Sequence, residues 1–146
     1  MNITSPAFKN KDRIPERYTC DGINVNPPLS IYDVPKDAKS LALILEDLDA
    51  PFGIFIHWIV YNIDSNTTKI KENSVPKGAR LIINDLKKLS YGGPCPPSGI
   101  HRYVFNLYAL NTKLVLQSDI KIDEFKKILK EHTVVKANYV GVYNRG

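Results

Sequence analysis

The chain contains four segments whose apolar residues alternate or run together as they do in β-strands: residues 40–46, 54–62, 102–110 and 133–143. The first, SLALILE, carries apolar side chains on both faces and therefore predicts a strand that is covered on both sides. The last two are rich in β-branched and aromatic residues, which strands favour. We expect these four segments to form the central strands of the fold.

The second segment, IFIHWIVYN, has a histidine in an otherwise apolar run. Strict alternation puts His57 on one face and Trp58 on the other, so we expect Trp58 to point away from His57 into a core or an interface. A buried histidine whose hydrogen bonds are satisfied is one interpretation of His57, and a functional residue is the other.

Only residues 121–131 have apolar side chains at helical spacing, with acidic residues near the start, where the helix dipole favours them. Ten prolines and eight glycines mark turns, most densely at residues 21–35 and 92–99. Many strands, frequent turns and one late helix predict a mainly β protein. The expected architecture is an antiparallel two-sheet β-sandwich with a peripheral helix in the C-terminal half.

The composition, 43% hydrophobic and 24% charged, suits one globular domain that spans residues 1–146. The N-terminus lacks the pattern of an export signal, and the apolar runs are far shorter than the ~20 residues of a membrane helix. We therefore expect a cytoplasmic protein without a transmembrane segment. Cys20 and Cys95 are then expected to be reduced thiols, with a single disulfide as the alternative if the source is a thermophile.

The net charge of +5 does not indicate a nucleic-acid partner. The 20 basic residues are scattered and form no extended basic run, whereas single-strand binders combine a basic groove with exposed aromatic side chains. The aromatic residues of this chain lie mostly in the strand-like segments. We attribute the charge to solubility and expect no nucleic-acid partner.

Several polar residues at strand ends are candidates for chemistry. His101 and Tyr103 are two apart at the start of a strand, so both side chains should share one face and could touch one ligand. The preceding loop, YGGPCPPSGI, is rich in glycine and proline and is either an anion-binding nest or an ordinary tight turn. Asp47 and Asp49 follow a buried strand, where at least one of them should hold the turn through Asx hydrogen bonds.

Taken together, five segments resemble the phosphatidylethanolamine-binding protein family, which includes the Raf kinase inhibitor proteins, in its bacterial and archaeal branch. They cover nearly the whole chain in order: YTCDGINVNPPL (18–29), SLALILEDLDAP (40–51), FIHWIVYNI (55–63), YGGPCPPSGIHRYVFNLYAL (91–110) and VGVYNR (140–145). Leu48 departs from the proline of the family's DPDAP motif, which puts the rigidity of that turn in doubt.

The resemblance implies a shallow pocket that binds phosphate-like or phospholipid-headgroup ligands, formed by Asp47, His57, Gly93, Pro94, His101 and Tyr103. Imidazole and phenol groups donate hydrogen bonds to phosphoryl oxygens. Asp47 more reasonably fixes a histidine tautomer or receives a ligand ammonium group. Asp49 and Pro51 are expected to hold the turn.

The leading hypothesis is a binding or regulatory protein without catalytic residues, cofactor or metal, similar to family members that inhibit serine proteases or modulate kinases. One alternative is a hydrolase that uses His57 or His101 with Asp47, and with Ser98 as nucleophile, although Ser98 lacks a nucleophile elbow. Another is a metal site built by the same two histidines and one carboxylate. His132 is expected to interact with the carbonyls at the helix end, Cys95 is a less favoured candidate for a reactive thiol, and a homodimer stays open.

Overall fold

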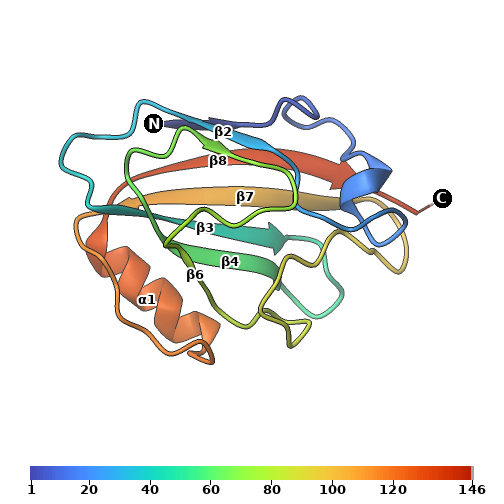
Figure 1. Cartoon of the computed structure of the whole chain (residues 1–146). Helices are drawn as coiled ribbons and strands as arrows, with labels where there is room; N and C mark the ends of the chain where they lie inside the picture. The colour runs from blue at the N-terminus through green and yellow to red at the C-terminus, as the bar shows by residue number, and fades with distance from the viewer. Residues whose placement is uncertain (146) are drawn as a thin grey trace.

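The fold consists of two antiparallel sheets and one helix, in a computed structural model that describes residues 1–145 (Figure 1). The large sheet has the order β6-β4-β3-β7-β8 and the small sheet the order β1-β2-β5. The large-sheet strands are β3 (Ser40–Asp47), β4 (Phe55–Ile63), β6 (Arg80–Leu81), β7 (His101–Leu110) and β8 (Thr133–Tyr143). The small-sheet strands are β1 (Asn2–Thr4), β2 (Leu29–Tyr32) and β5 (Lys69–Ile70), and a 3-10 helix η1 spans Glu16–Tyr18.

The central strand β3 of the large sheet is buried on both faces, as its apolar run predicts. One face packs against the small sheet in a core that includes Leu43, Phe105 and Ile31. The opposite face packs against helix α1 (Ile122–His132), where Ile44 and Phe125 belong to a second core. The predicted two-sheet sandwich with a peripheral helix is therefore confirmed.

Helix α1 ends differently from the prediction for His132. The Nδ1 atom of His132 lies 3.0 Å from the Asn111 side-chain oxygen, so this histidine ties the helix to a neighbouring loop. The carbonyl of Leu129 near the helix end is instead satisfied by Thr133, through its backbone N–H and its hydroxyl. No helix in residues 1–145 is long and apolar enough to cross a bilayer.

A β-bulge in β4 overturns the expected alternation around His57. Along β3, Leu45 pairs with Trp58 and Glu46 pairs with Ile56, so His57 is the extra residue between the two pairs. Trp58 joins the core between the sheets and Ile56 the core under the helix. The His57 ring contacts that of Tyr103, which belongs to the same core as Trp58. The bulge thus brings His57 and Trp58 to one side of the sheet.

The prediction of two reduced thiols is wrong, because Cys20 and Cys95 form a disulfide across 75 positions of sequence. The backbone N–H of Cys20 donates to the Pro94 carbonyl, which brings the two loops together. The Cα atoms are 5.4 Å apart, within the range that a disulfide requires. Neither cysteine is therefore a free, reactive thiol in this structure.

Candidate functional site

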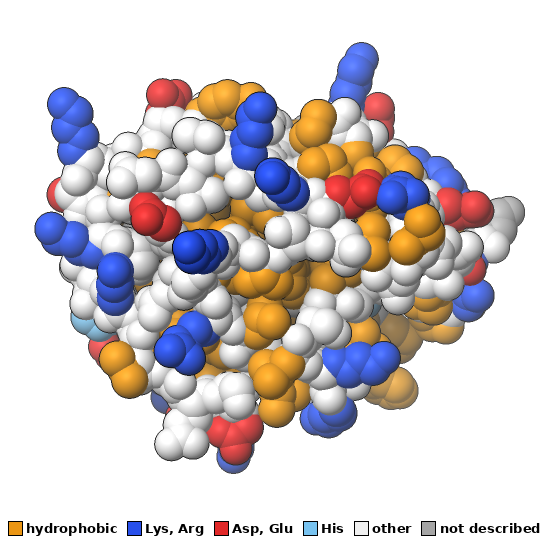
Figure 2. Space-filling view, in the orientation of Figure 1, with side chains coloured by type: hydrophobic (Ala, Val, Ile, Leu, Met, Phe, Trp, Pro, Cys, Tyr) orange, Lys and Arg blue, Asp and Glu red, His pale blue; other side chains and the backbone are white. Residues whose placement is uncertain are grey.

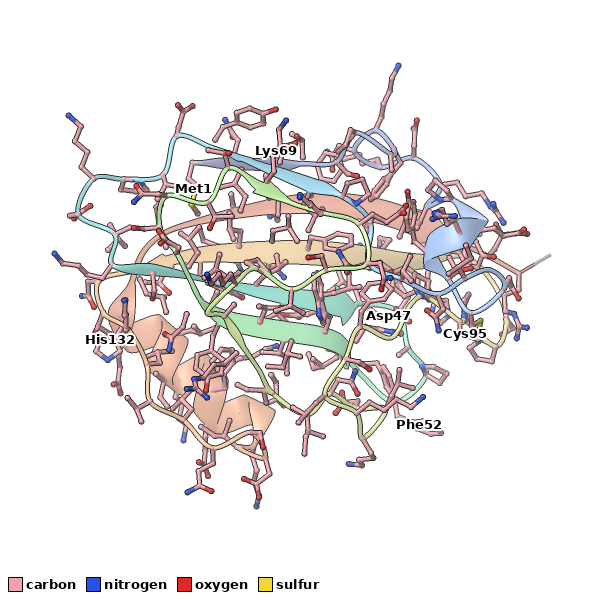
Figure 3. All side chains as sticks on the ribbon, in the orientation of Figure 1. Met1, Asp47, Phe52, Lys69, Cys95 and His132 are labelled. Atoms are coloured by element: carbon pink, nitrogen blue, oxygen red, sulfur yellow. A yellow bond between two sulfur atoms is a disulfide. The ribbon has the colours of Figure 1, made fainter. Side chains whose placement is uncertain are left out.

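A cavity of about 500 Å³ opens at the end of the large sheet where β3, β4 and β7 meet the disulfide-linked loops. Five of the six predicted binding residues line it, and Figure 3 shows Asp47, Cys95 and Phe52 at this end of the molecule, with His132 at the opposite end. The lining residues taken from the prediction are Asp47, His57, Gly93, His101 and Tyr103. Pro94 is the exception, because it is buried and does not line the cavity. Its carbonyl instead accepts a hydrogen bond from the Cys20 backbone N–H.

Asp47 and His101 form a buried pair at the floor of the cavity. The carboxylate Oδ2 of Asp47 lies 2.7 Å from His101 Nδ1, and the two residues are 4% and 6% exposed. This contact fixes the Nδ1–H tautomer and the ring orientation, which leaves Nε2 of His101 for a ligand. The other carboxylate oxygen accepts the backbone N–H of Asp49, the Asx turn expected at this strand end.

Asp49 holds the turn through hydrogen bonds to Arg102 of the neighbouring strand β7. Its carboxylate accepts the backbone N–H of Arg102 and two guanidinium N–H groups, and these bonds lower the pKa of Asp49 to about 2. Leu48 also holds the turn, because its backbone N–H donates to the Arg102 carbonyl, a bond that a proline at this position could not make. The structure thus replaces the rigidity of a proline with a hydrogen bond.

His57 lies across the floor from His101. Its Nδ1 atom is 2.7 Å from the Gly92 carbonyl, so Nδ1 carries the proton and donates it there. Burial lowers the pKa of His57 below its ordinary value, although the hydrogen bond to Gly92 and the charge of Asp47 act in the opposite direction. The neutral ring therefore has its Nε2 free as an acceptor.

Tyr103 lies between the two histidines. Its ring stacks on His101 with centroids 6.3 Å apart and meets His57 edge-on at 5.5 Å, which confirms that His101 and Tyr103 share one face. Its hydroxyl is buried and has no hydrogen-bond partner in residues 1–145. Burial, followed by the charge of Asp47, raises the pKa of Tyr103, so the hydroxyl stays protonated. A buried donor without a partner is costly and marks the place where a ligand atom or a water would be stabilised.

The glycine-rich loop is built as a wall of the cavity. The Gly93 N–H donates to the Asn24 side chain, so this amide is not free to bind an anion. A Cβ atom at Gly93 would lie 2.3 Å from the Tyr18 carbonyl oxygen and 2.9 Å from the Thr19 Cα. The loop can therefore approach the η1 segment closely only because residue 93 is a glycine.

Replacing Gly93 with alanine is expected to destabilise the protein by about 1–3 kcal/mol, the usual cost of forcing an atom into a packed site. Gly92→Ala is the matched control, because its Cβ would meet mainly the exposed and flexible Leu86 side chain. Urea unfolding of both variants measures the difference. Equal midpoints for the two variants would contradict this account of the loop.

The apolar rim of the cavity was not predicted from the sequence. Phe52, Ile54 and Leu86 line the mouth, and Phe52 is fully exposed at 104% of its reference area. Figure 2 shows apolar surface at the corner where Figure 3 places Phe52. Lys88 also lines the cavity. The signal in the sequence was an aromatic residue inside a Pro–Phe–Gly turn, where a polar residue is the usual choice.

The cavity lining bears on both alternative chemistries. Ser98 is exposed and does not line the cavity, and the described lining contains neither serine nor threonine. Asp47 and His101 already engage each other, and no group of three potential ligands in residues 1–145 is arranged to hold a metal ion. The cavity thus offers two imidazole Nε2 atoms and one phenol hydroxyl to a small ligand.

The fold is a β-sandwich, and the cavity at the end of its large sheet has a volume typical of small-molecule sites. More specifically, the chain belongs to the phosphatidylethanolamine-binding protein family, because the model of that family matches residues 4–144.

Relatives in archaea and bacteria agree with this assignment. The UPF0098 protein of Methanothermobacter thermautotrophicus is 45% identical, with both chains covered completely. The crystal structure of a phosphatidylethanolamine-binding protein homologue from Chlamydia trachomatis superimposes with a TM-score of 0.94 at 36% identity, covering 99% of this chain and 97% of the other. Escherichia coli YbcL, described as a new member of the mammalian family, gives a TM-score of 0.93 at 28% identity, with 99% and 98% covered.

Proposed function

We propose that the cavity binds a phosphate monoester or a phosphoethanolamine-like group, and that the protein acts by binding rather than by catalysis. The observation that carries the proposal is the orphaned Tyr103 hydroxyl between the two histidines, whose Nδ1 atoms are already held by the protein. Three groups therefore remain to contact phosphoryl oxygens. The apolar rim at Phe52 and Ile54 suits a ligand whose polar head continues into an apolar body.

The tautomers determine how such an anion would bind. With Nδ1–H donated to Gly92 and to Asp47, the Nε2 atom of a neutral ring is an acceptor, as is every oxygen of a phosphate dianion. An imidazole can donate to the anion only after Nε2 is protonated. Since burial lowers the pKa of His57, phosphate binding near neutral pH should be accompanied by proton uptake.

We expect phosphate affinity to rise as the pH falls from about 8 to about 5, the range in which histidines titrate. Calorimetric titration with inorganic phosphate and with phosphoethanolamine, in buffers of different ionisation enthalpy, measures both affinity and proton uptake. His57→Ala and His101→Ala should each weaken binding by about tenfold to a hundredfold, the value of one charged hydrogen bond. His132→Ala, at the other end of the molecule, is the matched control.

Three kinds of result would count against the proposal. Binding that is equally tight in wild type and in both cavity variants would make the histidines core residues. Hydrolysis of generic esters, peptides or phosphate esters that is lost in His101→Ala would favour the enzyme, and loss in Ser98→Ala would favour a serine nucleophile. Metal that co-purifies with wild type and is absent from His57→Ala would favour the metal site.

His57 should also make the unliganded protein sensitive to acid. Its folded pKa is below the unfolded value of about 6.5, so its contribution to stability is present above pH 6.5 and is lost as the pH falls through the folded pKa. The melting temperature of ligand-free protein should therefore fall on acidification, while the increase caused by phosphate should grow. In His57→Ala, the melting temperature of ligand-free protein should therefore fall less on acidification than in wild type, because residue 57 no longer titrates.

The expected partners and location extend this proposal. Inhibition of a serine protease or modulation of a kinase, expected from the family, would use the exposed rim, so a cavity ligand and such a partner should compete. The disulfide restricts the expected cytoplasmic location to cells whose cytoplasm preserves disulfides, as in hyperthermophiles. Alkylation of intact cells followed by mass spectrometry of the protein tests whether Cys20 and Cys95 are joined there.

A further inference from the structure

The cavity lined by His57, His101 and Tyr103 is called the phosphate cavity below, after its proposed ligand. A second hollow, of about 700 Å³, lies on the opposite face of the large sheet. Its floor includes Val104 and Asn106 from β7 and Val140 from β8, and helix α1 forms a wall with Leu129 and Lys130. We call this hollow the helix groove. Because alternate residues of a strand face opposite ways, Val104 points into the helix groove while its neighbour Tyr103 lines the phosphate cavity.

The helix groove exists because α1 covers only part of the sheet. Phe125 and Leu129 pack with Ala42 and Ile44 of β3 and with residues of β4. Within residues 1–145, no helix or strand covers the outer face of β7 and β8 beyond them, although this face carries the valines of the floor. The groove is therefore an apolar surface with one helical side.

Asn106 is the feature that indicates a ligand. It is only 7% exposed and lines the groove, yet its amide makes no hydrogen bond to any residue in 1–145. Its cross-strand neighbour Asn138 lines the groove as well. The fully buried polar atoms that lack a partner do not include the Asn106 amide, so the amide reaches the groove. The groove floor therefore presents a donor and an acceptor to a molecule from outside the fold.

The charge of the groove selects the sign of that molecule. Three lysines line it, and the one described carboxylate in the lining, Glu46, is 5% exposed and lies 3.4 Å from Lys126. Lys130 and Lys136 have no ion-pair partner in residues 1–145, and Lys136 sits over the Tyr108 ring at 5.2 Å. The groove therefore has an excess of positive charge beside an apolar floor.

We propose that the helix groove is a second binding site, for a small organic anion that carries a carboxylate or sulfonate on a flat apolar body. The anionic group contacts Lys130 and Lys136, and the body lies on Val104 and Val140. A polar atom of the ligand bonds to the Asn106 amide. This site is independent of the phosphate cavity, since the two open on opposite faces of the sheet.

The aromatic sulfonate 1-anilinonaphthalene-8-sulfonate is a suitable probe, because it has this chemistry and fluoresces when its body leaves water. Fluorescence titration of the folded wild-type protein should show saturable binding. Lys130→Glu/Lys136→Glu should weaken it by about tenfold or more, because two attractive charges become repulsive. The matched control is Lys9→Glu/Lys36→Glu, with both lysines exposed as Lys130 and Lys136 are and outside both cavity linings, and it should bind the probe as wild type does.

Asn106→Leu separates a binding role from a structural one. It should weaken the probe without lowering the melting temperature of ligand-free protein, because the Asn106 amide faces the groove and the substitution keeps a side chain of similar size there. A fall in both would make Asn106 a structural residue and overturn the proposal. The proposal also fails if the probe does not bind, if Lys130→Glu/Lys136→Glu binds it normally, or if only the control variant loses it.

Discussion

Breaking the Cys20–Cys95 disulfide is expected to lower the free energy of unfolding by about 2–5 kcal/mol, the usual range for a native bridge that closes a long loop. The bridge spans 75 positions, so the unfolded chain gains much conformational freedom when it is removed. It also joins two walls of the phosphate cavity. Reduction should therefore weaken phosphate binding as well as stability.

Urea unfolding of the oxidised protein, with and without a dithiol reductant, measures this effect, and Cys20→Ala/Cys95→Ala should reproduce the reduced state. The reductant should not change the unfolding of that double variant, which serves as the control. The same midpoint for oxidised and reduced wild-type protein would show that the bridge does not contribute to stability.

Removing one partner of the Asp47–His101 pair should cost about 3–5 kcal/mol of stability, because the remaining group is left buried and without its partner. Asp47→Ala has the further effect of removing the acceptor of the Asp49 N–H. The double variant should be much less unstable than the sum of the single variants, since neither member of the pair is then left buried without the other.

A double-mutant cycle by urea unfolding at neutral pH gives the coupling energy directly. Arg102→Ala is a comparison for an exposed pair, because the Arg102–Asp49 interaction lies at the surface and such pairs contribute about 0–1 kcal/mol. Additive effects of Asp47→Ala and His101→Ala would contradict the buried pair.

The long elements were predictable from the sequence because their patterns are local. The helix predicted at residues 121–131 is Ile122–His132, and the strand predicted at 133–143 is β8. The small sheet was not predicted in detail, since β5 has only two residues and too short a run to show a period. The same limit applies to β6.

The site was predictable in its residues but not in its construction. The spacing of His101 and Tyr103 was enough to place them on one face, whereas the grouping with His57 and Asp47 came from the family resemblance. The bulge that aims His57 depends on how β4 pairs with β3, and no local pattern encodes that register. Pro94 does not line the cavity, and its carbonyl accepts the Cys20 N–H. This contact joins residues far apart in the sequence, so no local pattern could predict it.

The extra residue in β4 has a consequence for redesign of this scaffold. A strand with regular alternation would have to give up either a core residue or a site residue at this point, but the bulge lets Trp58 and His57 both be kept. Ile56 and Trp58 are two positions apart, yet they face opposite sides of the sheet and belong to different cores. The rule for which side of the sheet a residue faces therefore changes at the bulge, and substitutions before and after it must follow different alternations. Deleting residue 57 would restore the regular pleat, and the scaffold would keep both of its cores while losing the imidazole on which one side of the cavity depends.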